Sequence, residues 1–372
     1  MMTLLTTDNF ALQVLWVILI AVLWIGFFVL EGFDFGVGML VPFLGKNDQG
    51  RRVVINTVGP HWDGNEVWLL TAGGAMFAAF PGWYATLFSG LYLPLFLVLV
   101  GLIVRGVAFE YRSKRESRTW RTAWDWALAI GSLIPPLVLG VGFANFIQGV
   151  PIVMHETAFG TSVPIVAAPA LLFQLFTVFT VIGGLLFVSL FLAQGAYFVA
   201  LKTKDEIHAR AQQYANILGL VAAVLALAFV LWANLGFFNN LDAKWGGLQN
   251  YNEALIPPII VWIVGILAIV LVAGAWFLNS IKRDGFAFLA NSAAIAVLTV
   301  MMFLHFVPGL GFANEINLTN VSSTDHTLTL MTIAAGCLVP VVLAYTIWSY
   351  FFVFKRRLNT TSIPALTVNT QD

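Results

Sequence analysis

The chain has 372 residues, of which 60% are hydrophobic and only 10% are charged, and it contains 32 Phe and 13 Trp. Soluble domains carry about 25% charged residues, so this composition excludes a soluble globular protein and indicates a polytopic membrane protein. The formal net charge is zero, and nothing in the charge distribution indicates a nucleic-acid partner. The single cysteine, Cys337, excludes a disulfide framework or a c-type haem attachment motif within the chain.

Apolar runs of about 20 residues or more, long enough to cross the hydrocarbon core of a bilayer, recur along the chain. We therefore expect an all-α fold with nine transmembrane helices, arranged as one helix plus two four-helix bundles. Residues 1–372 would form a single integral membrane domain with no soluble domain. The nine predicted spans are residues 11–34, 53–80, 83–110, 122–148, 165–201, 208–238, 257–281, 286–307 and 327–354.

Lysine and arginine residues lie on alternate connections between these spans or at the span ends beside them. Of the 18 basic residues, only Lys244 lies on the opposite set of connections. Cytoplasmic loops are enriched in Lys and Arg, so the distribution predicts the N-terminus outside and the C-terminus in the cytoplasm. The basic residues assigned to the cytoplasmic side are Lys46, Arg51, Arg52, Arg105, Arg112, Lys114, Arg115, Arg118, Arg121, Lys202, Lys204, Arg210, Lys282, Arg283, Lys355, Arg356 and Arg357.

Proline and glycine interrupt several of the predicted spans. Pro60 lies within the second span, where its missing N–H and its ring favour a kink. Pro135 and Pro136 are expected to interrupt the fourth span. The pairs Gly73–Gly74 and Gly183–Gly184 would allow neighbouring helices to approach closely. These features indicate either helix packing alone or a cavity for water or a ligand.

Four acids and one base lie within or at the ends of the first three spans. Glu31 and Asp34 are near the end of the first span, Asp63 and Glu66 are in the second, and Arg105 is near the end of the third. With the predicted topology, all five occupy the cytoplasmic half of the membrane. Because an unpaired charge at this depth costs at least about 2.5–3.5 kcal/mol, these side chains should face protein or internal water.

Three interpretations of these acids remain open. A fixed network could bind the first four spans, with Arg105 and Asp125 in structural ion pairs. Alternatively, the acids could form a substrate or cation site. In the third interpretation they conduct protons inward from the cytoplasm, because each i,i+3 pair shares a helix face and adjacent buried carboxylates seldom ionise together. The residues of this predicted proton path are Asp63, Glu66, His61, Asn65, Asp34 and Glu31.

The histidines and aromatic residues carry less information. No HxxxH, ExxH or His/Cys cluster occurs, so neither a metal site nor a haem-ligating pair is expected in this chain. Tryptophan is concentrated around the first four spans, where interfacial belts and packing are its usual roles. A quinone ring could also stack among these side chains.

Several polar motifs resemble subunit II of the cytochrome bd quinol oxidases. The resemblance is strong over about residues 16–151, and PHWDGNEVW is a long and unusually polar motif for a membrane helix. The motifs that carry it are EGFD at 31–34, GVGML at 36–40, PHWDGNEVW at 60–68, FEYRSK at 109–114 and QGVP at 148–151.

The resemblance implies a subunit of a bacterial cytoplasmic-membrane enzyme that oxidises quinol and reduces oxygen to water. In that family, subunit I carries the haems, of b and d type, and the quinol-oxidation site, whereas subunit II is a haem-free partner with nine spans. Small accessory subunits and a structural quinone in subunit II occur in some members. The resemblance favours Asp63 as a proton-path residue, while Glu66 and Glu31 depart from the Gln and Asp of some relatives.

The alternative function is that of a secondary transporter that uses the intramembrane acids as cation sites. Such transporters commonly contain two repeated halves with broken helices at corresponding places. No repeat of this kind is recognisable in the sequence. The oxidase subunit is therefore the favoured interpretation.

Overall fold

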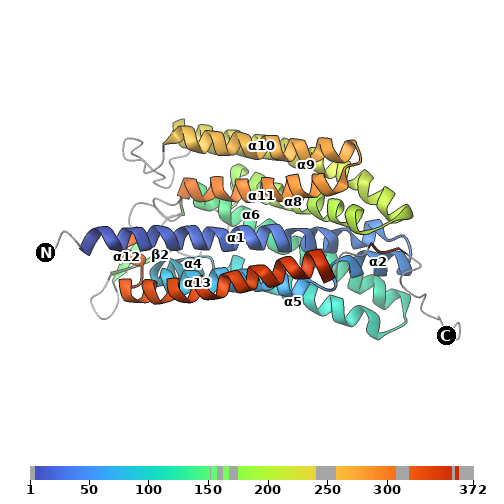
Figure 1. Cartoon of the computed structure of the whole chain (residues 1–372), viewed down its shortest axis with the longest axis horizontal. Coiled ribbons are helices and arrows are strands. Elements are labelled where there is room, and N and C mark those ends of the chain that lie inside the picture. Colours follow the sequence, from blue (N-terminus) through green and yellow to red (C-terminus); the bar gives the residue numbers. More distant parts are fainter. Residues whose placement is uncertain are drawn as a thin grey trace.

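Long helices lie side by side along one axis in the computed structural model (Figure 1). The structure describes residues 5–150, 152–156, 162–166, 175–239, 257–306, 318–353 and 357–359. Within this part of the chain, eight helices are long and apolar enough to cross a membrane. The chain is thus a multi-pass, nearly all-helical membrane protein, as the composition predicts.

The lengths of the described α-helices range from four residues to forty. Two short helical turns, η1 (Arg112–Lys114) and the π-helical η4 (Ser349–Val353), extend α5 and α13. The α-helices are α1 (Leu5–Leu44), α2 (Asp48–Val58), α3 (Trp62–Ala79), α4 (Pro81–Gly90), α5 (Tyr92–Tyr111), α6 (Arg118–Gln148), α8 (Val178–Lys202), α9 (Asp205–Asn239), α10 (Pro258–Ser280), α11 (Asp284–Phe306), α12 (Leu318–Val321) and α13 (Asp325–Trp348).

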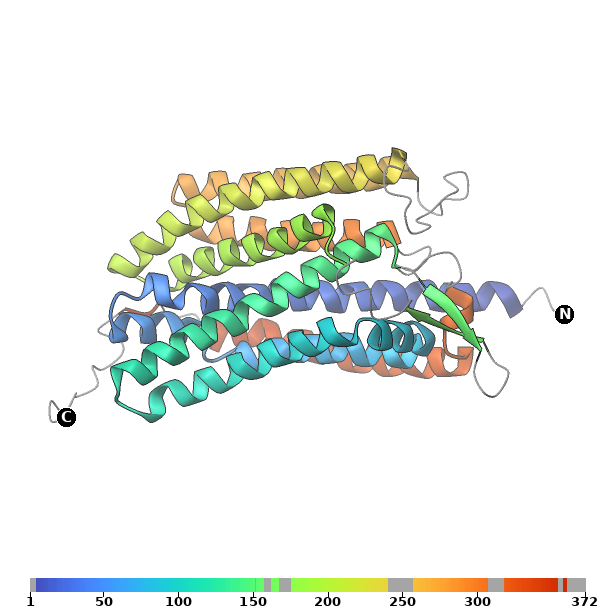
Figure 2. The same ribbon diagram turned by 180° about the vertical axis from the view of Figure 1, so that it is seen from behind.

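Helix α1 lies in the middle of the bundle. In the two opposite views, α8, α9, α10 and α11 lie on one side of it, and α3, α4, α5 and α13 lie on the other (Figures 1 and 2). Helix α6 contacts both α5 and α8, so it links the two sides. Phenylalanine side chains fill the centre: Phe28 of α1 makes an edge contact with Phe187 of α8, with ring centroids 5.0 Å apart.

The second predicted span is divided into two helices. α2 begins after Asn47, whose side chain caps it by accepting the Gly50 N–H at 2.7 Å. The chain then turns at Gly59 and Pro60, and α3 begins at Trp62. The expected kink is therefore a complete break, because Pro60 supplies no N–H to continue the helix. α3, with its polar first turn, is not among the eight apolar helices.

The third predicted span is also divided. α4 begins at Pro81, directly after α3, and α5 begins at Tyr92 after a non-helical Leu91. Pro94 lies in the first turn of α5, where a missing N–H is tolerated but cannot continue the hydrogen-bond ladder from α4. In both divided spans, a proline thus lies near the start of the second helix: Pro60 just before α3 and Pro94 in α5.

Pro135 and Pro136 do not interrupt α6, so that prediction was wrong. α6 runs without a break from Arg118 to Gln148. Packing against neighbouring helices preserves the helical path: a Cβ on Gly131 of α6 would lie 2.8 Å from the Gly101 carbonyl oxygen of α5. Neighbouring helices in membranes commonly support a proline within a continuous helix in this way.

Glycine permits close crossings at several helix pairs. The closest joins α1 and α8, where a Cβ on Gly36 would lie 1.8 Å from the Phe191 carbonyl oxygen. Gly183 and Gly184 lie against α6, as predicted. Gly73 and Gly74 have nothing within 4 Å of their Cβ positions in the described chain, so the close approach expected there does not occur within it.

A small β-hairpin, which was not predicted, lies between α6 and α8. β1 (Ile152–Glu156) pairs antiparallel with β2 (Ser162–Val166), with Met154 opposite Pro164. The fifth predicted span was assigned a start at residue 165, but α8 begins at Val178. Thr177 explains this start, because its side chain and that of Thr180 form a reciprocal capping box.

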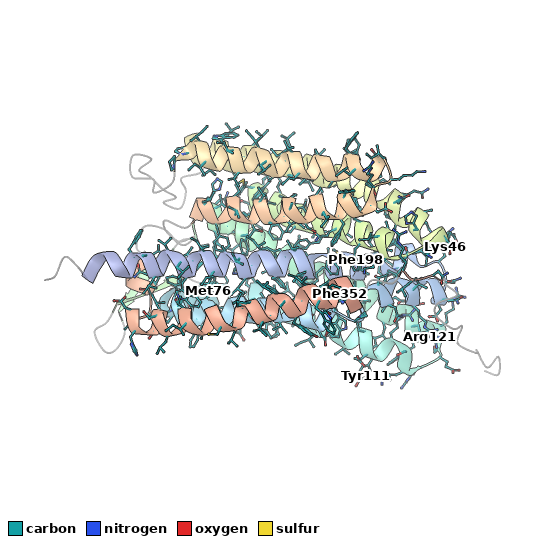
Figure 3. The ribbon with its side chains drawn as sticks, viewed as in Figure 1. Lys46, Met76, Tyr111, Arg121, Phe198 and Phe352 are labelled. Carbon is teal, nitrogen blue, oxygen red and sulfur yellow. The ribbon has the colours of Figure 1, made fainter. Side chains whose placement is uncertain are left out.

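Basic residues of the described chain mark one end of the bundle. Lys46 and Arg121 lie at this end, whereas Met76 of α3 lies well away from it (Figure 3). α1 begins at the opposite end, and α13 ends toward the basic end (Figure 1). This arrangement agrees with a topology in which the basic connections share one side of the membrane.

Candidate functional site

The break at Pro60 positions the first turn of α3 against the second half of α1. Glu31 and Asp34 of α1 then lie beside Asn65 and Glu66 of α3, and Arg105 of α5 reaches the same group. Three separate helices thus supply one polar cluster within the bundle. The sequence predicted these residues to occupy the same membrane level.

Arg105 is the cation of this cluster. Its Nη1 atom donates to Oε1 of Glu31 and to Oε1 of Glu66, the latter at 2.8 Å. Arg105 and Glu31 have no solvent-exposed side-chain area, whereas Glu66 is 24% exposed. The guanidinium also lies over the ring of Phe35, with Cζ 4.8 Å from the ring centroid. Burial and contacts on several sides fix the position of this cation.

Asn65 connects Asp34 to η4, the turn that follows α13. Its Nδ2 atom donates to Oδ2 of Asp34 at 2.6 Å and to the Leu30 carbonyl oxygen at 3.3 Å. The hydroxyl of Tyr350, in η4, donates to Oδ1 of Asn65 at 2.8 Å. The Tyr350 ring stacks on His61 with centroids 4.7 Å apart. The sequence analysis missed Tyr350, which follows a long apolar run and is 285 residues from Asn65.

The cluster contains more acids than bases. Arg105 faces three carboxyl groups, those of Glu31, Asp34 and Glu66. Oε2 of Glu31 and Oδ1 of Asp34 are buried and have no hydrogen-bond partner in the described part of the chain. Because ionised carboxylates are costly to bury without compensation, one guanidinium cannot balance all three. The arrangement is chemically suited to hold and release a proton.

Asp63 lies outside this buried cluster. It is exposed at the start of α3, and its Oδ1 atom accepts the Gly64 N–H at 2.8 Å. Val67, Leu70 and Phe77 are also exposed and follow Asp63 at helical spacing. Asp63 and this apolar stripe therefore share one face of α3, which the described part of the chain leaves uncovered.

Asp125 belongs to a second network, nearer the basic end. Oδ1 of Asp125 accepts from Nε of Arg112 at 2.5 Å, and Oδ2 accepts from Nη1 of Arg51 at 2.8 Å. Asp48 extends the network to Arg121 at 3.0 Å and contacts Arg112 at 2.9 Å. Arg105 and Asp125 thus both form ion pairs, but with different partners.

Three of the described histidines lie in separate parts of the bundle. His61 is stacked on Tyr350, Nδ1 of His305 lies 2.8 Å from the Met301 carbonyl oxygen, and His208 lies 3.7 Å from Asp284. Among the described residues, no three His, Cys, Asp or Glu side chains are grouped so that they could hold a metal ion.

Comparison with known proteins agrees with the motifs. The family described as "Cytochrome bd terminal oxidase subunit II" matches residues 12–353. This chain belongs to that family. Cytochrome bd ubiquinol oxidase subunit 2 of Bacillus subtilis is 40% identical over 354 residues, covering 94% of this chain and 97% of the relative. Cytochrome bd-I ubiquinol oxidase subunit 2 of Escherichia coli K12 is 38% identical over 373 residues, covering 94% and 96%.

A solved structure shares the fold. A chain of the bd oxidase from Geobacillus thermodenitrificans superimposes with a TM-score of 0.71 at 17% identity, covering 92% of this chain and 99% of that one. As a multi-pass member of the subunit II family, the chain is a component of a bacterial inner-membrane terminal oxidase. Family membership implies a partner subunit I.

Proposed function

We propose that this chain is the haem-free subunit of a bd-type quinol:oxygen oxidoreductase, that it stabilises subunit I, and that it carries protons from the cytoplasm for reduction of oxygen to water. Its relatives are named as ubiquinol oxidase subunits, which supports the oxidase over the transporter. The b and d haems are assigned to the partner, because subunit I carries them in the family to which this chain belongs. Quinol is likewise assigned to the partner, with a structural quinone and small accessory subunits as optional components.

The single observation that carries the proton-path proposal is the position of Asp63 relative to the buried acids. Asp63 and Glu66 are three residues apart in the first turns of α3, and Glu66 shares Arg105 with Glu31. One acid is therefore exposed, while the next is partly buried and hydrogen-bonded into the cluster. A series of carboxyl groups that pass from exposed to buried is suited to move protons between two environments.

The uncovered face of α3 supports assembly with the partner. Asp63, Val67, Leu70 and Phe77 share this face, and Gly73 and Gly74 leave open space beside it. An ionised carboxylate facing lipid would be costly, whereas a protein partner could both pair with Asp63 and accept protons from it. Subunit I is the occupant that fits both roles.

The test is to substitute Asp63→Asn in the complete oxidase, with Glu116→Gln, at an exposed site in the α5–α6 connection, as the matched control. We expect Asp63→Asn to retain the b- and d-type haem spectrum and lower oxygen consumption per haem at least tenfold, while Glu116→Gln keeps the wild-type rate. Normal turnover in an assembled Asp63→Asn enzyme would refute the proton path. Loss of haem together with subunit I would instead assign Asp63 to assembly.

A further inference from the structure

The end of α13 meets the buried acid cluster through one side chain. α13 ends at Trp348 and continues as the π-helical turn η4, which contains Tyr350. Turns of this type are rare and frequently occur at functional sites. Tyr350 contacts the cluster and two neighbouring rings: its hydroxyl donates to Asn65, its ring stacks on His61, and it makes an edge contact with Phe33, with centroids 6.3 Å apart.

A second contact holds the chain beyond Tyr350. The Leu358 N–H donates to the Lys202 carbonyl oxygen at 2.7 Å, and the Lys204 N–H donates to the Leu358 carbonyl oxygen at 3.2 Å. Leu358 and Thr203 form an isolated parallel β-bridge, and Thr203 is fully buried. The chain is therefore attached to the α8–α9 connection eight residues after Tyr350, which limits movement of η4 away from α3.

The direction of the hydrogen bonds gives Tyr350 a specific effect. A hydroxyl that donates to Asn65 Oδ1 requires the amide oxygen to face η4, so the amide nitrogen must face Asp34 and Leu30. If the amide inverted, its oxygen would face Oδ2 of Asp34 and the carbonyl oxygen of Leu30, neither of which can donate while Asp34 is ionised. Asp34 and Leu30 thus favour this orientation of Asn65, and the Tyr350 hydroxyl, which donates to Oδ1, stabilises it further.

We propose that Tyr350 is a positioning residue for proton transfer, acting through Asn65 to keep a hydrogen-bond donor on Asp34. This inference rests on the proposed proton-path function. The Tyr350 hydroxyl is not required to carry a proton itself. Its role is to keep Asn65 in the orientation that presents N–H to the buried carboxyl group, so that each turnover begins from the same hydrogen-bond arrangement.

The experiment compares Tyr350→Phe with Thr346→Val in the complete oxidase. Each variant removes one hydroxyl from the end of the same helical segment, but the Thr346 hydroxyl only donates to its own helix, at the Val342 carbonyl oxygen. We expect Tyr350→Phe to lower oxygen consumption per haem about three- to tenfold, as loss of one hydrogen bond predicts. The KM for quinol should stay unchanged, the solvent deuterium isotope effect should increase, and Thr346→Val should behave as wild type.

A double-mutant cycle with Asn65→Ala separates positioning from general structure. If Tyr350 acts through Asn65, then Tyr350→Phe has no further effect on the rate per haem once Asn65 is alanine. Unchanged turnover per haem in Tyr350→Phe would overturn the inference, and so would rate losses that multiply in the double variant. Because the rates are given per haem, a lower yield of assembled oxidase does not affect either comparison. A slow Asp63→Asn with a normal Tyr350→Phe would refute only this inference, whereas a normal Asp63→Asn would refute the proposed path itself.

Discussion

The Nη1 atom of Arg105 lies 2.8 Å from Oε1 of Glu66, so a cation of α5 is paired with an acid of α3. The same atom donates to Glu31 of α1. One guanidinium nitrogen therefore joins three helices inside the bundle. This arrangement makes Arg105 important for packing as well as for the charge balance of the acids around it.

Arg105→Met should destabilise the subunit strongly. It leaves the fully buried Glu31 without a cation, and breaking a buried ion pair in this way typically costs about 3–5 kcal/mol. We expect a large loss of assembled oxidase and a lower melting temperature in detergent. Adding Glu31→Gln should restore part of the yield, because the remaining buried group is then neutral. Equal yields for the single and double variants would contradict the pairing described here.

Much of this cluster was predictable because charges are rare in membrane spans. Glu31, Asp34, Glu66 and Arg105 were recognisable as polar residues in apolar runs, and alternating basic connections assigned them to one membrane level. Helical spacing also indicated that acids on the same helix share a face. Their pairing across helices required the three-dimensional arrangement, since spacing along one helix does not specify the crossing angle of the next.

Other features were not predictable for identifiable reasons. Tyr350 is an aromatic residue at the end of an apolar run, where interfacial placement is the ordinary expectation. Asp48 and Arg51 belong to α2, a polar helix that the sequence analysis treated partly as loop and partly as span. α8 begins late because the threonine capping box at Thr177 determines its start, and that signal was hidden within a continuous apolar stretch.

The second network predicts a contrast between buried and exposed ion pairs. Asp125 is fully buried between Arg51 and Arg112, whereas Lys46 and Glu206 form a pair with side chains 71% and 68% exposed. Asp125→Asn should lower the melting temperature markedly, since it leaves two guanidinium groups with weaker partners. Lys46→Gln should have almost no effect, because its pair with Glu206 is exposed and exposed pairs contribute little. Thermal unfolding of the two purified variants, at low and high salt, measures the difference.

The α1–α8 crossing predicts a steric effect at Gly36. An added Cβ would lie 1.8 Å from the Phe191 carbonyl oxygen, a distance that requires the helices to move apart. Gly36→Ala should therefore cost about 1–3 kcal/mol, as overpacking usually does. Gly142→Ala in α6 is the control, because nothing lies within 4 Å of its Cβ position in the described chain. A normal melting temperature for Gly36→Ala would show that the two helices are farther apart than described.

The last prediction concerns the attachment of the C-terminal segment at Leu358 to the α8–α9 connection. Leu358→Pro removes the N–H that donates to the Lys202 carbonyl oxygen. If this attachment holds Tyr350 against Asn65, turnover per haem should fall about two- to fivefold, in keeping with the loss of one net hydrogen bond. Arg357→Ala, which keeps its backbone N–H, is the control and should have the wild-type rate.

The decisive comparison places Leu358→Pro in the Tyr350→Phe background. If the segment acts only by positioning Tyr350, the proline substitution should cause no further loss of turnover once the tyrosine hydroxyl is absent. The same fractional loss in both backgrounds would instead assign the attachment a separate role, because Leu358 would then influence the enzyme through the α8–α9 connection at Thr203 rather than through η4.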